Sequence, residues 1–157
     1  MGLFITIEGG EFTGKTSVAM PGLVAFFESL AIPVKTSREP GGTPAGEAIR
    51  TKIFQRLREG ADAYEAALLF NEARKIHLEE VIFPWLGRDR SQKTIMLLDR
   101  YLDTTRVYQG MVGGVPMERI LALEKEYAHS FYPDLTFILY FPENIFAADI
   151  LFLDMYE

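Results

Sequence analysis

The stretch that decides the fold is residues 3–17, which read LFITIEGGEFTGKTS. Residues 3–8 form a short run of apolar and β-branched side chains that ends in a glycine pair, which is typical of a buried strand. Residues 9–16 match the pattern G-x-x-x-x-G-K-[ST], and a helical stretch follows at residues 15–30. In such a strand–loop–helix unit the backbone N–H groups point at an anion, and the helix N-terminus adds positive potential. The stretch therefore predicts a phosphate-binding loop in an α/β fold.

The loop also predicts which side chains contact a nucleotide and its metal ion. We expect Lys15 to reach the β- and γ-phosphates of a nucleotide and the Thr16 hydroxyl to hold Mg²⁺. The loop alone leaves open whether the protein is an ATPase, a GTPase switch or a kinase. Asp99 ends an apolar strand and is the expected second metal contact, with the N-cap of the following helix as its alternative role. The predicted ATP-binding residues are Gly9, Gly10, Glu11, Phe12, Thr13, Gly14, Lys15, Thr16 and Ser17.

Strands and helices are predicted to alternate along the rest of the chain. The further predicted elements are strands at residues 32–36, 94–98 and 135–141 and helices at residues 44–57, 61–86 and 117–129. Pro21 predicts a kink or an early end of the first helix, because proline removes an intrahelical hydrogen bond. Continuous apolar strands between helices predict a parallel sheet covered on both faces, which binds ligands at the carboxyl ends of its strands. The expected class is a single α/β domain of the P-loop NTPase type over residues 1–157.

Composition narrows the possible functions. The chain has 157 residues, 48% of them hydrophobic, which suits one domain and is too few for two. A net charge of −6 disfavours binding to a nucleic-acid backbone, and the absence of cysteine excludes disulfides and thiolate catalysis. The N-terminal apolar run is cut short by Glu8, so it predicts neither a signal peptide nor a membrane span. We expect a cytoplasmic protein that binds neither nucleic acid nor membrane.

A second group of residues suits a small phosphorylated nucleoside. REPGGT at residues 38–43 predicts a turn after a strand, while Phe70 and Arg74 lie four residues apart and share one helix face. A ring and a guanidinium so placed can stack on a flat base and hydrogen-bond to it. Gln109 carries the donor and acceptor that a pyrimidine edge needs, and the Arg100 guanidinium can bind a phosphate with two parallel N–H groups. Taken alone, a phenylalanine such as Phe70 is more often a core residue than a stacking platform, and an arginine such as Arg74 is usually solvated.

Five segments give the chain a resemblance to one family. They are FITIEGGE-x-x-GKT, REPGGTPAGEAIR, LLFNEAR, LLDRYLDTTRVYQG and YPDLT. In this order and at similar spacing they resemble bacterial thymidylate kinases. The resemblance implies a nucleoside-monophosphate-kinase fold with a parallel sheet of order 2-3-1-4-5. It also implies transfer of the ATP γ-phosphoryl group to dTMP with Mg²⁺, and a homodimer.

The resemblance further implies roles for particular residues. The implied acceptor site consists of Glu39, Arg50, Phe70, Arg74, Arg100, Thr105 and Gln109. Within it, Phe70 would stack on thymine, Arg74 would bond its carbonyl edge, and Arg50 and Arg100 would hold the 5′-phosphate. Glu11 would lie near the sugar 3′-hydroxyl and the phosphates. The implied catalytic residues are Lys15, Glu11 and Arg100.

The chain departs from the family pattern in four respects, one of which is the Pro21-Gly22 interruption of the helix behind the phosphate loop. Phe12 occupies a loop position that is glycine in bacterial members and arginine in eukaryotic ones. Residues 143–157 contain no Lys or Arg, although bacterial members carry lid arginines there and continue with more helix and a fifth strand. We therefore expect the chain to lack a basic lid and the last strand. An active kinase and a nucleotide-binding relative with little turnover both remain open, whereas a GTPase-like switch lacks an Asn/Lys-x-x-Asp segment.

Overall fold

The computed structural model describes residues 1–141 of the chain. Its strands are β1 (Leu3–Gly9), β2 (Val34–Arg38), β3 (Ile95–Asp99) and β4 (Leu135–Leu139). Its α-helices are α1 (Met20–Ser29), α2 (Pro44–Arg58), α3 (Ala63–His77), α4 (Phe83–Leu86), α5 (Leu102–Thr105) and α6 (Met117–Tyr127). Three π-helical segments adjoin these helices, at Lys15–Ala19, Leu78–Ile82 and Arg106–Val112. The predicted α/β class is confirmed.

The four strands form one parallel sheet of order β2-β3-β1-β4. This order confirms the first four places of the order expected from the sequence. The register aligns Ile7 of β1 with Asp99 of β3, and Asp99 in turn with Arg38 of β2. The carboxyl ends of three strands therefore meet at one edge of the sheet, directly before the phosphate loop, the residue 38–43 turn and α5.

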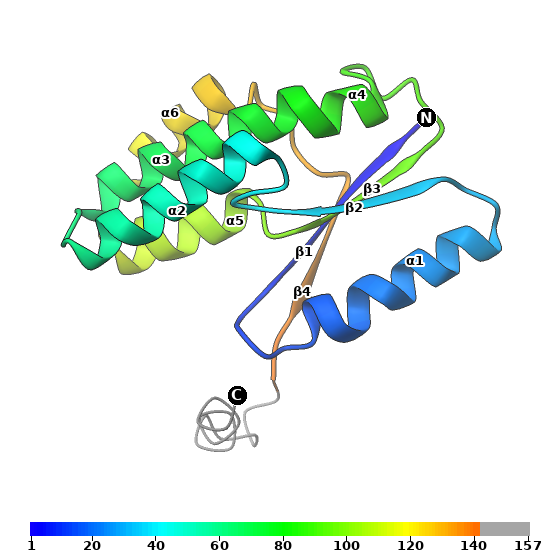
Figure 1. Cartoon of the computed structure of the whole chain (residues 1–157), viewed down its shortest axis with the longest axis horizontal. Coiled ribbons are helices and arrows are strands. Elements are labelled where there is room, and N and C mark those ends of the chain that lie inside the picture. Colours follow the sequence, from blue (N-terminus) through cyan, green and yellow to red (C-terminus); the bar gives the residue numbers. More distant parts are fainter. Residues whose placement is uncertain (142–157) are drawn as a thin grey trace.

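Alternating side chains of the strands build two cores, one on each face of the sheet. On one face, α1 packs against the odd-numbered strand residues Ile5, Ile7, Ile95 and Leu97. On the other face, the even-numbered residues Phe4, Met96 and Leu98 pack against Leu78, Ile82, Phe83 and Leu86. Figure 1 shows α1 alone on one side of the strands and helices α2–α6 on the other. The sheet is thus the middle layer of a three-layer domain.

Side-chain caps define where the two helices beside the site begin. The Thr43 hydroxyl accepts from the Gly46 N–H at 2.9 Å at the start of α2, and Pro44 occupies the first helical position. The Asp62 carboxylate accepts from the Glu65 N–H at 2.8 Å at the start of α3. The two caps fix where α2 and α3 begin relative to the residue 38–43 turn.

The predicted elements agree with the structure except at two places. Of the kink or early end predicted at Pro21, the early end is wrong, because the helix continues past Pro21. Its hydrogen bonding changes from π to α at Met20, which puts Pro21 in the first turn of α1. A proline is tolerated there because that N–H needs no intrahelical partner. The helical residues 102–112 were not predicted, because Thr and Tyr are weak helix formers. Tertiary contacts hold this segment: Arg106 binds the buried Glu124 carboxylate of α6 at 2.8 and 2.7 Å.

Two further predictions concern a membrane span and the lid. Every helix within residues 1–141 is too short or too polar to cross a lipid bilayer. The arginine-free residues 143–157, where the sequence predicts a lid without basic side chains, lie outside the described residues.

Candidate active site

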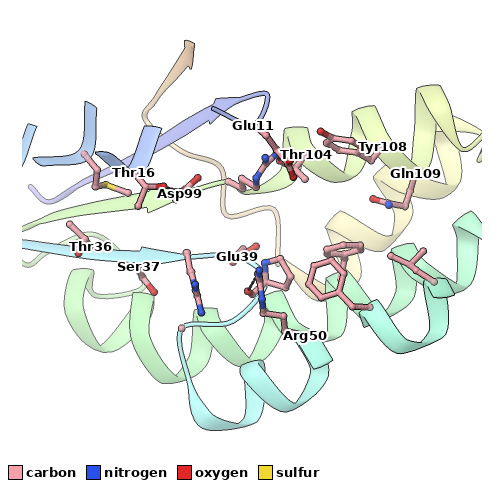
Figure 2. A pocket seen from close by; sticks show the side chains of 18 residues that line it. Glu11, Thr16, Thr36, Ser37, Glu39, Arg50, Asp99, Thr104, Tyr108 and Gln109 are labelled. Atoms are coloured by element: carbon pink, nitrogen blue, oxygen red, sulfur yellow. Dashed lines mark hydrogen bonds between the residues drawn. The ribbon is translucent and has the colours of Figure 1, made fainter. Parts of the chain in front are cut away.

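A cleft of about 760 Å³ opens where the carboxyl ends of β1, β2 and β3 meet. Residues from the phosphate loop, the turn after β2, helices α2 and α3, and the segment after β3 line it. In Figure 2, Thr16 and Asp99 lie toward one end of the cleft, Glu39 and Arg50 along its middle, and Tyr108 and Gln109 toward the other end. The cleft therefore joins the predicted metal position to the predicted base position.

Lys15 precedes Thr16, one of the cleft-lining residues, in the phosphate loop. Gly14 has a φ of +83°, a backbone conformation that glycine adopts without strain. The Lys15 ammonium donates to the carbonyl oxygens of Gly9 at 3.0 Å and Gly10 at 2.5 Å, and the residue is 7% exposed. Burial, and secondarily the positive charge of Arg100, lower the pKa of Lys15. An anion at this loop would be favoured, because it would compensate a partly desolvated cation.

Phe12 takes a backbone conformation that suits glycine. Its φ is +60°, in the left-handed region, and its side chain is 51% exposed. A left-handed backbone costs a non-glycine residue about 1–2 kcal/mol, because its Cβ approaches the carbonyl oxygen that follows. The loop thus keeps its geometry with phenylalanine at this position, but at a cost that glycine would not incur.

Thr16 and Asp99 are in contact and leave one carboxylate oxygen for a further ligand. The Thr16 hydroxyl donates to Asp99 Oδ2 at 2.7 Å, whereas Asp99 Oδ1 is buried and has no hydrogen-bond partner within residues 1–141. A buried oxygen without a partner is unfavourable unless a ligand or water binds it. No cluster of three or more His, Cys, Asp or Glu that would hold a metal alone is present in the described part of the chain. This donor set fits Mg²⁺, which typically binds one or two protein oxygens, water and substrate phosphates.

Three guanidinium groups line the cleft and make it suitable for a phosphate. They belong to Arg38, Arg50 and Arg100. Arg50 donates to the Pro40 carbonyl oxygen at 2.9 Å, and Arg38 forms an exposed ion pair with Glu47 at 3.0 Å. That ion pair and the Gly42 N–H lower the pKa of Glu47. Arg38 is therefore partly neutralised, and Arg50 and Arg100 carry the positive charge of this region.

The predicted acceptor residues divide into two sets. Glu39, Arg50, Phe70, Arg100 and Gln109 line the cleft. Arg74 and Thr105 are 2% and 0% exposed and lie behind the lining residues. The structure thus brings five of the predicted residues to one cavity and sets two behind it.

Arg74 is engaged mainly with the protein itself. Its guanidinium donates to Glu39 at 2.8 Å, and its remaining contacts are the Asn71 amide oxygen at 2.9 Å, the Tyr101 carbonyl at 3.0 Å and the Thr105 hydroxyl at 3.1 Å. A guanidinium has five N–H groups, so these four bonds leave one for a ligand. The predicted bond from Arg74 to a thymine carbonyl rests on that one group and stays a prediction.

Gln109 lines the cleft and carries a buried acceptor without a hydrogen-bond partner in residues 1–141. The residue is 7% exposed, and the acceptor is its Oε1. Such an atom is unfavourable by about 1–3 kcal/mol unless a donor reaches it. A ligand bound here should therefore present an N–H or O–H group to Gln109.

Sequence reasoning missed a buried hydrogen-bond chain beneath the cleft. The Ser37 hydroxyl lies 2.7 Å from His77 Nε2, and His77 Nδ1 lies 3.1 Å from Glu39 Oε1. His77 is completely buried, so the chain connects the cleft-lining Ser37 with the Glu39–Arg74 ion pair. The sequence signal for it was the three-residue spacing of Arg74 and His77, which puts both on one helix face.

Comparison with known proteins identifies one family. The sequence pattern described as thymidylate kinase matches residues 7–149. The chain is 41% identical over 139 residues to the thymidylate kinase of Mesoplasma florum and 42% identical over 144 residues to that of Pseudomonas syringae. These alignments cover 88% and 92% of this chain but 63% and 66% of the relatives, so the chain spans less than two thirds of their length.

A solved structure is similar as well. The crystal structure of thymidylate kinase from Ehrlichia chaffeensis superposes with a TM-score of 0.73 at 34% sequence identity. The match covers 88% of this chain and 74% of that one.

Proposed function

Because the chain belongs to the thymidylate kinase family, we propose that it transfers the γ-phosphoryl group of ATP to dTMP, which gives dTDP and ADP. The cleft supports this proposal because its phosphate-binding and base-binding residues lie in different parts of it. Thr16, the neighbour of Lys15 in the phosphate loop, lies toward one end of the cleft, Arg50 in its middle and Gln109 toward the other end, and Arg100 and Phe70 line the same cleft. A nucleoside monophosphate placed base-first would therefore direct its phosphate toward the donor.

The observation that carries the choice of base is the unsatisfied Oε1 of Gln109. Thymine and uracil carry an N–H at ring position 3, whereas cytosine has a bare acceptor nitrogen there. The Gln109 acceptor can therefore pair with thymine or uracil. With cytosine it would face another acceptor, the ring nitrogen at position 3. Phe70 lines the same cleft and offers a ring on which the base would stack. The site therefore favours dTMP or dUMP over dCMP.

The proposed chemistry needs positioning and charge compensation more than a protein base. A 5′-phosphate oxygen of dTMP is already nucleophilic, and phosphoryl transfer depends on alignment and on neutralising the developing charge. Lys15 would bind the phosphates of ATP, and Arg50 and Arg100 would hold the acceptor phosphate. Mg²⁺ held by Thr16 and Asp99 would, when bound, neutralise the β- and γ-phosphate oxygens. Glu11 lines the cleft beside these groups and is proposed to face the sugar and the phosphates.

The test is a coupled assay of ADP formation with ATP and MgCl₂. We expect ADP production to require both dTMP and the divalent cation, to be slower with dUMP, and to be negligible with dCMP or AMP. Lys15→Met should abolish turnover, while the exposed Lys125→Met should leave it unchanged. Equal rates with dCMP would overturn the base assignment. Binding of dTMP and ATP without turnover would identify a nucleotide-binding relative.

A cytoplasmic location and a homodimer belong to the same proposal and are supported by the family membership alone. Sedimentation of the purified protein at several concentrations would test the dimer. A single monomeric species at all concentrations would refute that part.

A further inference from the structure

We propose that Glu8 is a positioning residue that holds the turn carrying Arg100 against the phosphate-loop strand, and so fixes the acceptor arginine relative to Lys15. The proposal rests on the function proposed above, because Arg100 has its role only if a phosphate binds in the cleft. Glu8 itself does not line the cleft and belongs to none of the motif positions assigned to a nucleotide.

The first step of the argument is the position of the Glu8 carboxylate. Glu8 is 5% exposed and immediately precedes Gly9, the first residue of the loop. Strand alternation turns its side chain to the same face as Phe4, which contacts Tyr101 ring to ring. Its Oε1 accepts from the Tyr101 backbone N–H and its Oε2 from the Thr104 hydroxyl, both at 2.7 Å. One carboxylate therefore joins the end of β1 to two points of the segment after β3.

The second step is the backbone at Arg100. Its φ is +67°, a left-handed conformation in which a long side chain is uncommon. Such a residue persists where the surrounding structure over-determines it. Here the Arg100 N–H donates to the Ile7 carbonyl at 3.0 Å, and the next N–H, of Tyr101, donates to Glu8. Two consecutive residues of β1 thus hold two consecutive N–H groups of this turn.

The third step is the side chain of Arg100. Its Nη1 lies 3.4 Å from the oxygen of Thr104, which lines the cleft. Thr104 and Tyr108 belong to the same helical segment in Figure 2. Because the single hydroxyl proton of Thr104 goes to Glu8, its oxygen lone pairs are left for the guanidinium. Glu8 therefore sets the direction of the Thr104 hydroxyl as well as the backbone of the turn.

The charges near Glu8 support a role in function rather than in stability. Arg100, Asp103 and Lys15 all lie close enough to interact with it electrostatically. Burial is the main cause that raises the pKa of Glu8, and its two hydrogen bonds oppose that rise without cancelling it. The ionised carboxylate is therefore unfavourable for folding where it lies. A neutral residue of the same shape would avoid that cost, but it would not hold both donors in the same way.

The test uses Glu8→Gln, Thr104→Val and the double variant, with the exposed α1 residue Glu28→Gln as a control that removes the same charge. In the ligand-free protein, Glu8→Gln should speed hydrogen exchange of the Arg100 and Tyr101 amides. It should melt no lower than wild type at neutral pH. The dissociation constant for dTMP should rise about tenfold, the typical loss for a bond to a charged group, while the KM for ATP changes by less than about twofold.

The losses of dTMP affinity in the two single variants should not be additive, because both substitutions interrupt the same chain of contacts. The double variant should therefore bind dTMP no more weakly than Glu8→Gln alone, and Glu28→Gln should behave as wild type in every measurement. Unchanged exchange of the Arg100 and Tyr101 amides in Glu8→Gln, or fully additive losses in the double variant, would overturn the inference. A lower melting temperature with unchanged dTMP affinity would also overturn it and make Glu8 purely structural.

The exchange measurement separates this inference from the proposed function. If wild type fails to bind dTMP while Glu8→Gln still speeds hydrogen exchange of the two amides, the proposed function fails and the contact between Glu8 and the turn stands. If wild type phosphorylates dTMP and Glu8→Gln has no effect on exchange or affinity, only the inference fails.

Discussion

Removing the charge of the buried Glu39 should destabilise the protein far more than removing the charge of the exposed Glu47. Glu39 and Arg74 form an ion pair at 2.8 Å with side chains only 4% and 2% exposed. In Glu39→Gln the guanidinium of Arg74 stays buried without an anion, and breaking a buried pair in this way costs about 3–5 kcal/mol. Because a domain of this size has a total stability of about 5–15 kcal/mol, the variant should lose a large share of it.

The chain offers a matched control in Glu47. It pairs with Arg38 at 3.0 Å, but those side chains are 42% and 57% exposed. An exposed pair contributes about 0–1 kcal/mol, so Glu47→Gln should unfold at nearly the wild-type urea concentration. The assay is urea unfolding of the ligand-free proteins, followed by fluorescence of the single tryptophan, Trp85.

A further variant separates charge burial from packing. Adding Arg74→Met to Glu39→Gln removes the uncompensated cation and should recover part of the lost stability. The reasoning would be refuted by a loss of less than about 1 kcal/mol in Glu39→Gln, since that is the range of solvent-exposed pairs. It would equally be refuted if Arg74→Met lowered the free energy of unfolding of Glu39→Gln further, as an independent destabilising substitution would.

Three further predictions concern the loop, the base and Glu8. Phe12→Gly should be more stable than Phe12→Ala by about 1 kcal/mol in urea unfolding, because alanine keeps the left-handed strain; equal stabilities would contradict the strain. Gln109→Leu should lower kcat/KM for dTMP about tenfold, because the ring N–H loses its acceptor; an unchanged kcat/KM would place the base elsewhere. The raised pKa of Glu8 means that the folded protein binds this proton more tightly than the unfolded chain does. Its stabilising contribution is therefore full below about pH 4.5 and is lost as pH rises through the folded pKa, so urea titrations should show wild type losing stability relative to Glu8→Gln across that interval.

Much of the fold was predictable because its signals are local. The glycine spacing and Lys15 specify a loop conformation through residues that are neighbours in sequence, and the apolar runs specify parallel buried strands. Even there, the helical character of residues 102–112 escaped prediction. That segment is held by Arg106 and the buried Glu124, 18 residues further along the chain, rather than by its own helix propensity.

Five of the seven predicted acceptor residues line the cleft, but how their side chains are arranged could not be predicted from the sequence. By itself the sequence determined that a phosphate loop, an acidic strand end and a set of arginines would gather at one edge of a sheet. Only the tertiary structure decided that Arg74 turns inward to Glu39, a partner 35 residues away, and that Glu8 holds a turn 93 residues away. Local spacing encodes which face a side chain leaves from, but the distance between two faces depends on how separate helices and strands pack, and that is set by the whole core at once.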